Sequence, residues 1–220
     1  MFPIRRTLIV AAHPDDEILG VGGTIGKLTA RGAEVAIVIL CNGRPSLEER
    51  MSAVTKVAGH VLGVREVRTL NHPNLRLETY PVAEIAGQLE KIFADFKPET
   101  VLTHHYGDVN RDHFAAYHAV LTAARPLSSC CVESVFTFET PSSTDWAESV
   151  SDRIFRPNAY VDITETFDLK MEALRLYDDE MRPFPHSRSY QGVEALARTR
   201  GMAVGVRFAE AFSLIRGVWS

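Results

Sequence analysis

The chain has 220 residues, of which 45% are hydrophobic, and a formal net charge of -4. This acidic balance argues against a nucleic-acid-binding surface, which usually requires a basic stripe. No apolar run approaches the roughly 20 residues of a membrane span, and the three cysteines (Cys41, Cys130 and Cys131) form no disulfide framework. We therefore expect a cytoplasmic protein without a membrane span.

In the first half of the chain, short apolar runs alternate with segments whose apolar residues recur at helical spacing. Short apolar runs predict buried strands at 7–12, 34–40, 65–70, 99–105 and 132–139. Apolar residues at helical spacing predict helices between them, at 16–32, 46–63, 82–96 and 112–125. Strand–helix alternation with short connections indicates an α/β fold, a Rossmann-like three-layer α/β/α sandwich with a mostly parallel sheet.

The second half of the chain is less regular. The pattern predicts an outer strand at 155–164, helices at 164–181 and 190–201, and a proline-rich loop at 182–189. No linker or internal repeat separates the two halves. We expect one domain over residues 1–220, in which 141–220 completes the fold and the site of a core formed by 1–140.

Polar clusters follow several of the predicted strands. They are "HPDDE" after the first strand, "CNGRPS" after the second, "HHYGDVNRDH" after the fourth and "ETPSST" after the fifth. Because ligands of parallel α/β sheets bind beyond the carboxyl ends of the strands, we expect the chemistry at this edge.

Two familiar motifs do not fit the first cluster. The run "GVGGTIGK" lacks the glycine spacing of a dinucleotide fingerprint or a P-loop, so small residues that let the helix approach the sheet explain it better. A receiver domain would need a phosphorylatable aspartate after the third strand, where the chain reads "LNHPN".

A metal site explains the clusters better. His13 and Asp16, three residues apart across a strand-to-helix turn, can face one point together with His113. Two imidazoles and one carboxylate suit zinc and leave a position for water, whose proton Asp15 could accept. Taken alone, Asp15 or Asp16 could instead cap the helix, and His113 could be an ordinary residue at a helix start.

The stretch "AAHPDDEILGVGG" with the later "DVNRDH" resembles the LmbE-like (PIG-L) superfamily of zinc-dependent N-deacetylases. The superfamily includes N-acetylglucosaminyl-phosphatidylinositol, mycothiol and bacillithiol deacetylases, and the resemblance covers nearly the whole chain. It implies one zinc ion per chain, bound by His13, Asp16 and His113, with Asp15 as the catalytic base. The further stretches "HHYGDVNRDHFAAYHAVLTAARP" and "ETPSSTDW" resemble a bacterial branch linked with cell-envelope glycan or antibiotic biosynthesis.

The resemblance also implies supporting and substrate-binding residues. Asp112 would orient the site through hydrogen bonds, and Glu17 would support it. Arg50 matches the arginine of an Arg-x-x-Glu pattern that contacts substrate hydroxyls, although Ala53 replaces the glutamate and a surface arginine is an alternative. Asp108 is a further substrate-binding candidate.

Two departures from the family pattern concern substrate and acid. Asn74 stands where relatives have an aspartate that binds sugar hydroxyls, and Asn110 where several have a histidine that acts as electrophile or acid. His105 and His186 are therefore our candidates for the catalytic acid. His186 and Arg188 could close over the site, or belong to a merely structural loop. By their positions in the sequence, Tyr106, Arg76 and Trp146 could also shape the sugar pocket.

We therefore expect a zinc-dependent hydrolase that removes the N-acetyl group from an N-acetylated amino sugar or sugar conjugate and releases acetate. The partner would be that small molecule, without nucleic acid, and a homo-oligomer is possible. The alternatives are a metal-dependent amidase for a non-sugar N-acyl amine and a non-catalytic sugar-binding relative.

Overall fold

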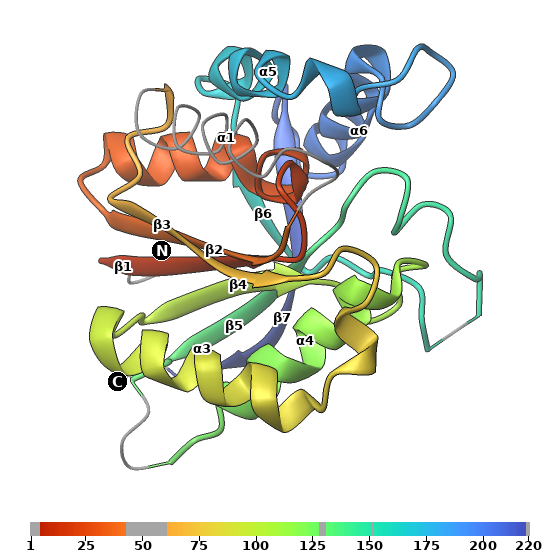
Figure 1. The fold of residues 1–220 in the computed structure, drawn as a ribbon. Coiled ribbons are helices and arrows are strands. Elements are labelled where there is room, and N and C mark those ends of the chain that lie inside the picture. The colour runs from red at the N-terminus through yellow and green to blue at the C-terminus, as the bar shows by residue number, and fades with distance from the viewer. Residues whose placement is uncertain (1–4, 43–60, 128–130, 151, 219–220) are drawn as a thin grey trace.

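The structure is a computed structural model that describes residues 5–42, 61–127, 131–150 and 152–218. Within these residues, seven strands form one sheet in the order β3-β2-β1-β4-β5-β7-β6 (Figure 1). The strands are β1 (Arg6–Ala11), β2 (Glu34–Cys41), β3 (Glu66–His72), β4 (Thr100–His104), β5 (Ser134–Phe138), β6 (Ala159–Asp162) and β7 (Ala209–Gly217).

The sheet is parallel from β3 to β5 and mixed beyond. β1 pairs in parallel with both β2 and β4, while β3 and β5 extend the parallel part on either side. β7 runs antiparallel to its two neighbours, β5 and β6. The carboxyl ends of the first five strands therefore meet at one edge, where sites of parallel sheets form.

Helices cover both faces of the sheet, which gives three layers. In Figure 1, α1, α5 and α6 lie on one side of the strands, and α3 and α4 lie on the other. None of the helices in the described ranges is long and apolar enough to cross a bilayer. The helices are α1 (Asp16–Ala30), α3 (Val82–Phe96), α4 (Arg111–Ala123), α5 (Phe167–Arg175) and α6 (Tyr190–Met202), with short 3-10 helices η2 (Leu77–Thr79) and η3 (Asp178–Glu180).

Each face of the sheet has its own hydrophobic core. Alternation along β1 sends Ile9 to the cluster on the α1 side and Leu8 to the cluster on the α3 and α4 side, and both are fully buried. A strand buried on both faces is apolar at every position rather than at alternate ones. This is why the central strands appear in the sequence as unbroken apolar runs.

The fold class is confirmed, and most elements lie where the sequence predicts them. The predicted helix 82–96 coincides with α3, whereas the predicted helix 164–181 is shorter, because α5 ends at Arg175 and η3 follows separately. The predicted outer strand 155–164 shortens to β6, and β7 was not predicted. The predicted helix 46–63 lies largely outside the described residues.

The glycines of α1 allow close packing against the rest of the molecule. A Cβ atom at Gly20 would lie 2.4 Å from the Phe138 ring of β5, and one at Gly23 would lie 2.8 Å from Ile163. The helix is also interrupted at Val21, whose φ of -138° and ψ of 17° are not helical. The packing interpretation of "GVGGTIGK" is confirmed.

Candidate metal centre

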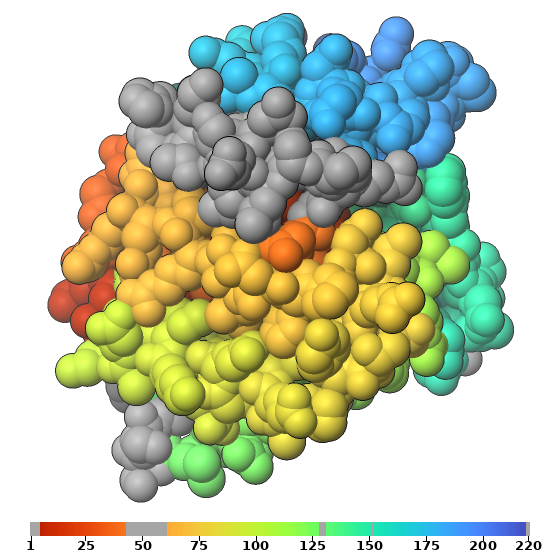
Figure 2. Space-filling view, in the orientation of Figure 1, coloured from red at the N-terminus to blue at the C-terminus, as the bar shows by residue number. Residues whose placement is uncertain are grey.

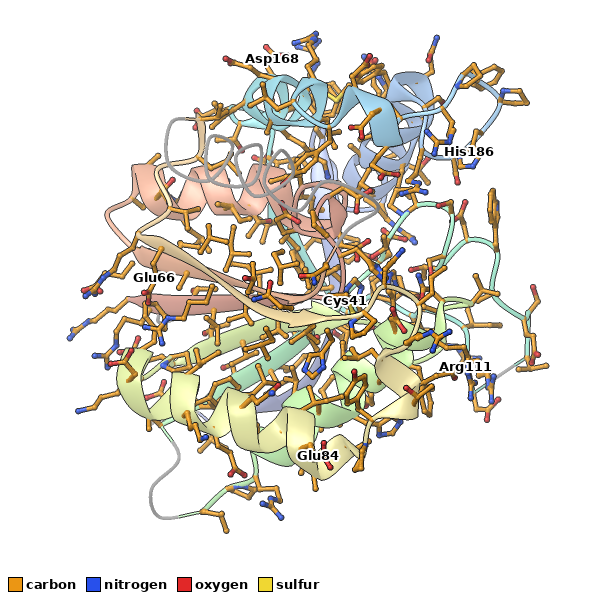
Figure 3. All side chains as sticks on the ribbon, viewed as in Figure 1. Cys41, Glu66, Glu84, Arg111, Asp168 and His186 are labelled. Atoms are coloured by element: carbon orange, nitrogen blue, oxygen red, sulfur yellow. The ribbon has the colours of Figure 1, made fainter. Side chains whose placement is uncertain are left out.

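A cleft of about 480 Å³ opens at the carboxyl edge of the parallel strands. The loops after β1, β3, β4 and β5 line it, together with the segment between α5 and α6. His186 of that segment and Arg111 at the start of α4, both in its lining, stand on opposite sides of this edge in Figure 3. In the space-filling view, the teal segment after β5 and the blue segment that includes α6 form the right-hand side of the molecule (Figure 2).

Three predicted metal ligands meet at the floor of this cleft. The Oδ2 atom of Asp16, at the start of α1, lies 3.2 Å from His13 Nδ1 and 3.3 Å from His113 Nε2. His13 lies in the loop after β1, and His113 lies in the first turn of α4. The potential ligand atoms of the three residues lie within 4.8 Å of one another. The fold therefore brings side chains about 100 positions apart into one cluster.

The donor atoms of this cluster suit a divalent metal ion. His113 is only 2% exposed, and its Nε2 atom has no hydrogen-bond partner among the described residues. Two imidazoles and one carboxylate are ligands that zinc and related divalent ions accept. The residues present therefore fit a divalent metal ion.

Two further carboxylates orient the imidazoles from behind. Asp108 Oδ2 lies 2.8 Å from His113 Nδ1, and Asp112 Oδ2 lies 3.0 Å from His13 Nε2. Asp108 also accepts a hydrogen bond from Thr144. Metal-binding histidines commonly have such a partner on the second ring nitrogen, which fixes the tautomer and the ring orientation.

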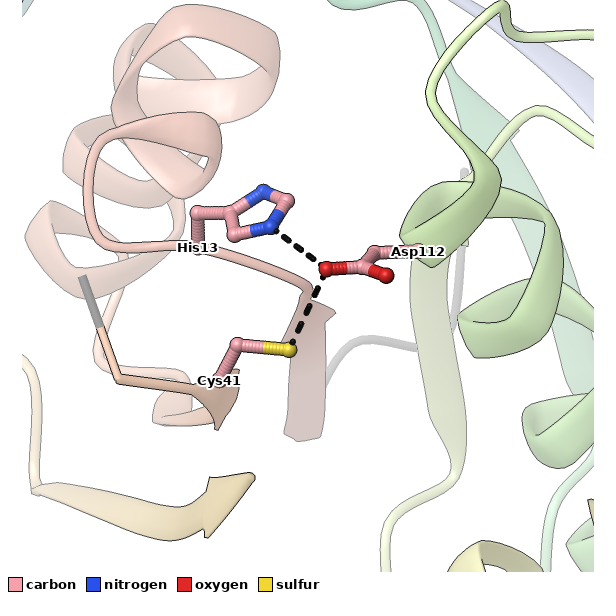
Figure 4. A group of neighbouring side chains, drawn as sticks. All are labelled: His13, Cys41 and Asp112. Atoms are coloured by element: carbon pink, nitrogen blue, oxygen red, sulfur yellow. Dashed lines mark hydrogen bonds and ion pairs between the residues drawn. The ribbon is translucent and has the colours of Figure 1, made fainter. Parts of the chain in front are cut away.

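Cys41 lies beside this arrangement and, with His13 and Asp112, forms a second group of potential ligand atoms. Figure 4 shows the Cys41 thiol and His13 on the same Asp112 oxygen, at 3.6 Å and 3.0 Å. Burial raises the pKa of the Cys41 thiol, and the negative charge of Asp112 adds to the rise. Without a metal ion the thiol keeps its proton and acts as a weak hydrogen-bond donor to Asp112.

The metal-free cluster is strongly coupled electrostatically. Burial opposes ionisation of Asp16, yet His113 and His104 hold the pKa of its carboxyl well below the ordinary value. Burial alone lowers the pKa of His13, but hydrogen bonds to Asp112 and Asp16 raise it to about 9. Burial likewise opposes protonation of His113, while Asp16 and Asp108 raise its pKa to about 10. Positive charge is therefore favoured where a metal ion would lie.

Asp15 is held in an unusual conformation next to the cluster. Its φ of 116° lies in a region that non-glycine residues rarely adopt, and such strain persists where surrounding contacts enforce it. Glu17 accepts a hydrogen bond from the Asp15 amide at 3.0 Å, and Arg188 donates one to the Asp15 carboxylate at 2.8 Å. Burial and Asp16 raise the pKa of Asp15 well above its ordinary value, although Arg188 opposes the rise.

Glu17 is buried behind the turn that carries Asp15. Its second oxygen accepts a hydrogen bond from the Tyr177 hydroxyl at 2.7 Å. Burial raises the pKa of Glu17 to about 7, although the hydrogen bond from Tyr177 opposes the rise. Glu17 therefore connects the strained turn to the segment after α5.

Comparison with known proteins identifies the family of the chain. Residues 8–124, more than half of the chain, match the family model for PIG-L, described as GlcNAc-PI de-N-acetylase. The chain belongs to the PIG-L family. The members of this metal-dependent family are deacetylases. This PIG-L protein is therefore a deacetylase, which is a hydrolase.

Relatives of this PIG-L protein match most of its length. It is 27% identical to the "Uncharacterized deacetylase YaiS" of Escherichia coli (strain K12), over 78% of this chain and 89% of the relative. It is 26% identical to the 1D-myo-inositol 2-acetamido-2-deoxy-alpha-D-glucopyranoside deacetylase of Mycobacterium sp. (strain JLS), over 97% and 84%. The structure of the N,N'-diacetylchitobiose deacetylase from Pyrococcus horikoshii shares the fold, with a TM-score of 0.78, 24% identity and coverage of 98% and 85%.

The structure places the two adjacent histidines at the end of β4, His104 in the strand and His105 just after it, differently from our expectation. His105, our candidate acid, turns away from the cleft, and its Nε2 atom lies 2.8 Å from the Arg153 carbonyl oxygen. His104, which the sequence analysis passed over, is fully buried, accepts a hydrogen bond from the Ala12 amide, and stacks on His113 with ring centroids 3.7 Å apart. Alternation along β4, which puts His104 on the side of Leu102, was the signal that could have distinguished them.

The remaining predicted residues divide between the cleft and its support. Asn74, His186 and Arg188 line the cleft, and so does Asn110, whose side-chain oxygen also caps α4 by accepting from the Asp112 amide. Asp108, expected to bind substrate, instead lies behind His113, outside the lining of the cleft. Its position indicates a role in orienting that imidazole. Arg50 falls outside the described residues.

Proposed function

We propose that this protein is a zinc-dependent N-deacetylase that removes the acetyl group from an N-acetylated amino sugar or sugar conjugate. One zinc ion would be held by His13, Asp16 and His113. The observation that carries the proposal is the buried cluster of His13, Asp16 and His113, whose potential ligand atoms lie within 4.8 Å of one another and next to Asp15 in the chain. Relatives of the chain deacetylate acetylated sugar conjugates: the Mycobacterium enzyme is a 1D-myo-inositol 2-acetamido-2-deoxy-alpha-D-glucopyranoside deacetylase, and the Pyrococcus neighbour is an N,N'-diacetylchitobiose deacetylase.

When bound, zinc would supply a Lewis acid that polarises the acetyl carbonyl and acidifies water. Asp108 and Asp112 hold the two imidazoles so that their other ring nitrogens face Asp16. The protein therefore contributes a fixed set of ligand atoms rather than flexible side chains.

Asp15 carries the proton transfer in this proposal. Its carboxylate accepts a proton from the attacking water as the water oxygen forms a bond to the acetyl carbon. The pKa of Asp15, raised by burial and by Asp16, suits a carboxylate that must hold a proton for part of the reaction. The proton then moves to the amine nitrogen as the carbon–nitrogen bond breaks, which yields acetate and a free amine.

Arg188 keeps this carboxylate in place. It donates to one Asp15 oxygen, Oδ2, which leaves Oδ1 for water. His186 also lines the cleft, and its Nδ1 atom accepts a hydrogen bond from the Arg188 amide. We propose His186 as the alternative donor of the proton to the leaving amine.

Acetate release from a panel of N-acetylated sugars and non-sugar N-acyl amines tests the proposal, with zinc-loaded and chelator-treated protein compared. Asp15→Ala is expected to retain zinc and to lose about 10²- to 10⁴-fold in acetate release. Asp152→Ala, which removes an exposed carboxylate outside the cleft, is the matched control. Normal activity of Asp15→Ala would contradict the assignment of the base, and release only from non-sugar amines would make the protein a different amidase.

A further inference from the structure

We infer that the substrate carries, next to its N-acetylated sugar, an uncharged group with an apolar face. This group binds against Leu75, Val109 and Trp146 at the mouth of the cleft, which we call the apolar rim. The inference rests on the proposed function and specifies the class of conjugate that the same site accepts.

The apolar rim consists of three large side chains that the fold leaves in water. Leu75 is 60% exposed, Val109 55% and Trp146 56%, and all three line the cleft. They come from three different loops, after β3, β4 and β5. Single exposed apolar residues are ordinary on protein surfaces. Three that converge on one concave site indicate a surface for an apolar part of a ligand.

The backbone holds Leu75 in this position at a cost. Its φ of 56° is left-handed, a conformation that costs a leucine on the order of 1–2 kcal/mol. Two residues later, the Leu77 amide donates a hydrogen bond to Asp112 Oδ1 at 2.9 Å. Because Asp112 also holds His13, the loop that presents Leu75 is fixed relative to the metal ligands.

Trp146 is fixed from the opposite side of the cleft. Its ring meets the His186 ring edge to face, with centroids 4.9 Å apart and planes at 68°. His186 accepts a hydrogen bond from the backbone amide of Arg188, and the Arg188 side chain donates one to Asp15. An indole supported in this way while more than half exposed offers a rigid surface at low entropic cost to binding.

The charges of the cleft favour an uncharged group over an anionic one. Five carboxylates and two guanidinium groups line the cleft among the described residues. Both guanidinium groups already have carboxylate partners, since Arg188 binds Asp15 and Arg111 binds Glu78 at 2.8 Å. An anionic group at the mouth would compete with Glu78 for Arg111 and would approach further carboxylates, an arrangement that disfavours it.

A matched set of glycosides tests the inference. The probes are N-acetylglucosamine, its phenyl glycosides and its 4-carboxyphenyl glycosides, each glycoside as α and β anomer, assayed by acetate release with the zinc-loaded full chain. For one anomer, kcat/KM of the phenyl glycoside is expected to exceed that of the free sugar at least about 10-fold. The added carboxylate is expected to remove most of this gain.

Variants of the apolar rim connect the gain to these side chains. In Leu75→Ser and Trp146→Ala, the ratio of kcat/KM for phenyl glycoside over free sugar is expected to fall towards one. Met202→Ser, at an exposed apolar residue of α6 outside the cleft, is expected to keep the wild-type ratio. Measuring the ratio rather than one rate separates loss of this subsite from a general loss of folded protein.

The outcomes distinguish this inference from the proposed function. Equal kcat/KM for free sugar and phenyl glycosides, or faster hydrolysis of the 4-carboxyphenyl compounds, would overturn the inference and leave the deacetylase proposal intact. An unchanged ratio in both rim variants would overturn it as well. Absence of acetate release from every sugar would overturn both.

Discussion

Two buried charged clusters stand near the two ends of the first half of α1, and they differ in how completely their atoms are satisfied. At the helix start, Asp16 faces the metal-ligand imidazoles, and one of these has an unpartnered ring nitrogen. Behind the interruption at Val21, Glu210 of β7 accepts hydrogen bonds from the Gly23 and Thr24 amides at 3.0 and 2.7 Å. Lys170 of α5 donates to Glu210 at 2.7 Å and to the Leu19 carbonyl at 2.8 Å.

The difference separates structure from function in two clusters of similar burial. The amides of Gly23 and Thr24 begin the second half of the interrupted helix. Glu210 accepts hydrogen bonds from them, a role that an N-cap residue has in an ordinary helix. Lys170 supplies the opposite charge, so this cluster is complete without any other ion. The metal-ligand cluster is incomplete in the same sense, and that is what makes it a candidate for metal binding.

Substitution of a ligand in the metal-ligand cluster is expected to have the largest effect, and this effect is on activity. Asp16→Asn keeps the size of the side chain but removes the charge and one ligand oxygen. We expect zinc binding to be lost and acetate release to fall by about 10³-fold or more. Zinc content by atomic spectroscopy and acetate release measure both effects, and a normal zinc stoichiometry would contradict the assignment of Asp16 as a ligand.

The same substitution in the complete cluster is expected to act on stability instead. Glu210→Gln leaves Lys170 buried without its counter-charge, which typically costs about 3–5 kcal/mol of unfolding free energy. The folded fraction should still bind zinc. Urea unfolding measures the loss, and the double variant Lys170→Met, Glu210→Gln should recover part of it, because removing both charges leaves no unpaired one. A loss below about 1 kcal/mol would show that the pair contributes little to stability.

The pH dependence of the metal-free protein sharpens the comparison. The folded-state pKa values of His13 and His113, about 9 and 10, exceed the unfolded value of 6.5. Their contribution to the unfolding free energy is therefore fully present below pH 6.5. It is lost as the pH rises through 9 to 10, which lowers the unfolding free energy on the order of a few kcal/mol. Urea unfolding between pH 6.5 and 10 measures this loss. Zinc-loaded protein should lack it, because ligating imidazoles are already neutral.

The smallest expected effects distinguish the neighbouring histidines at the end of β4. His104→Asn removes the ring that stacks on His113 and accepts the Ala12 amide, so we expect acetate release to fall about 10- to 100-fold with zinc affinity weakened. His105→Asn removes a hydrogen bond to Arg153 outside the cleft and should leave kcat/KM within about twofold, with about 1 kcal/mol lost from stability. The reverse order would contradict the role that their positions indicate.

Local patterns in the sequence were enough to predict much of the sheet and the centre of the site. Buried parallel strands such as β1 and β2 are continuous apolar runs, and α3 has a regular apolar period, so neither depends on distant contacts. The stretch "HPDDE" follows a strand directly, so its place at the sheet edge could be predicted from its position alone. The stretch "NRDH", which follows a neighbouring strand, contains His113 and allowed its prediction as the third ligand.

Other features depend on contacts between residues far apart in the chain. β7 contains Glu210 and Arg216 and has no unbroken apolar run, so its insertion between β5 and β6 leaves little local signal. The amides that follow the interruption of α1 donate to a carboxylate from β7. The pair of letters "HH" alone does not distinguish His104 from His105; the alternation along the whole of β4, which puts His104 on the side of Leu102, is needed for that choice.

The contact between Glu210 and Gly23 joins residues 187 positions apart. During synthesis, β7 emerges from the ribosome after the other described strands and helices, since chains emerge from the N-terminus at about 5–20 residues per second. Until then α1 lacks the carboxylate that caps its second half, and β6 lacks the strand that joins it to the sheet. The segment that carries Asp16 is therefore made long before Glu210, which supports α1. We expect metal loading to follow the emergence of β7.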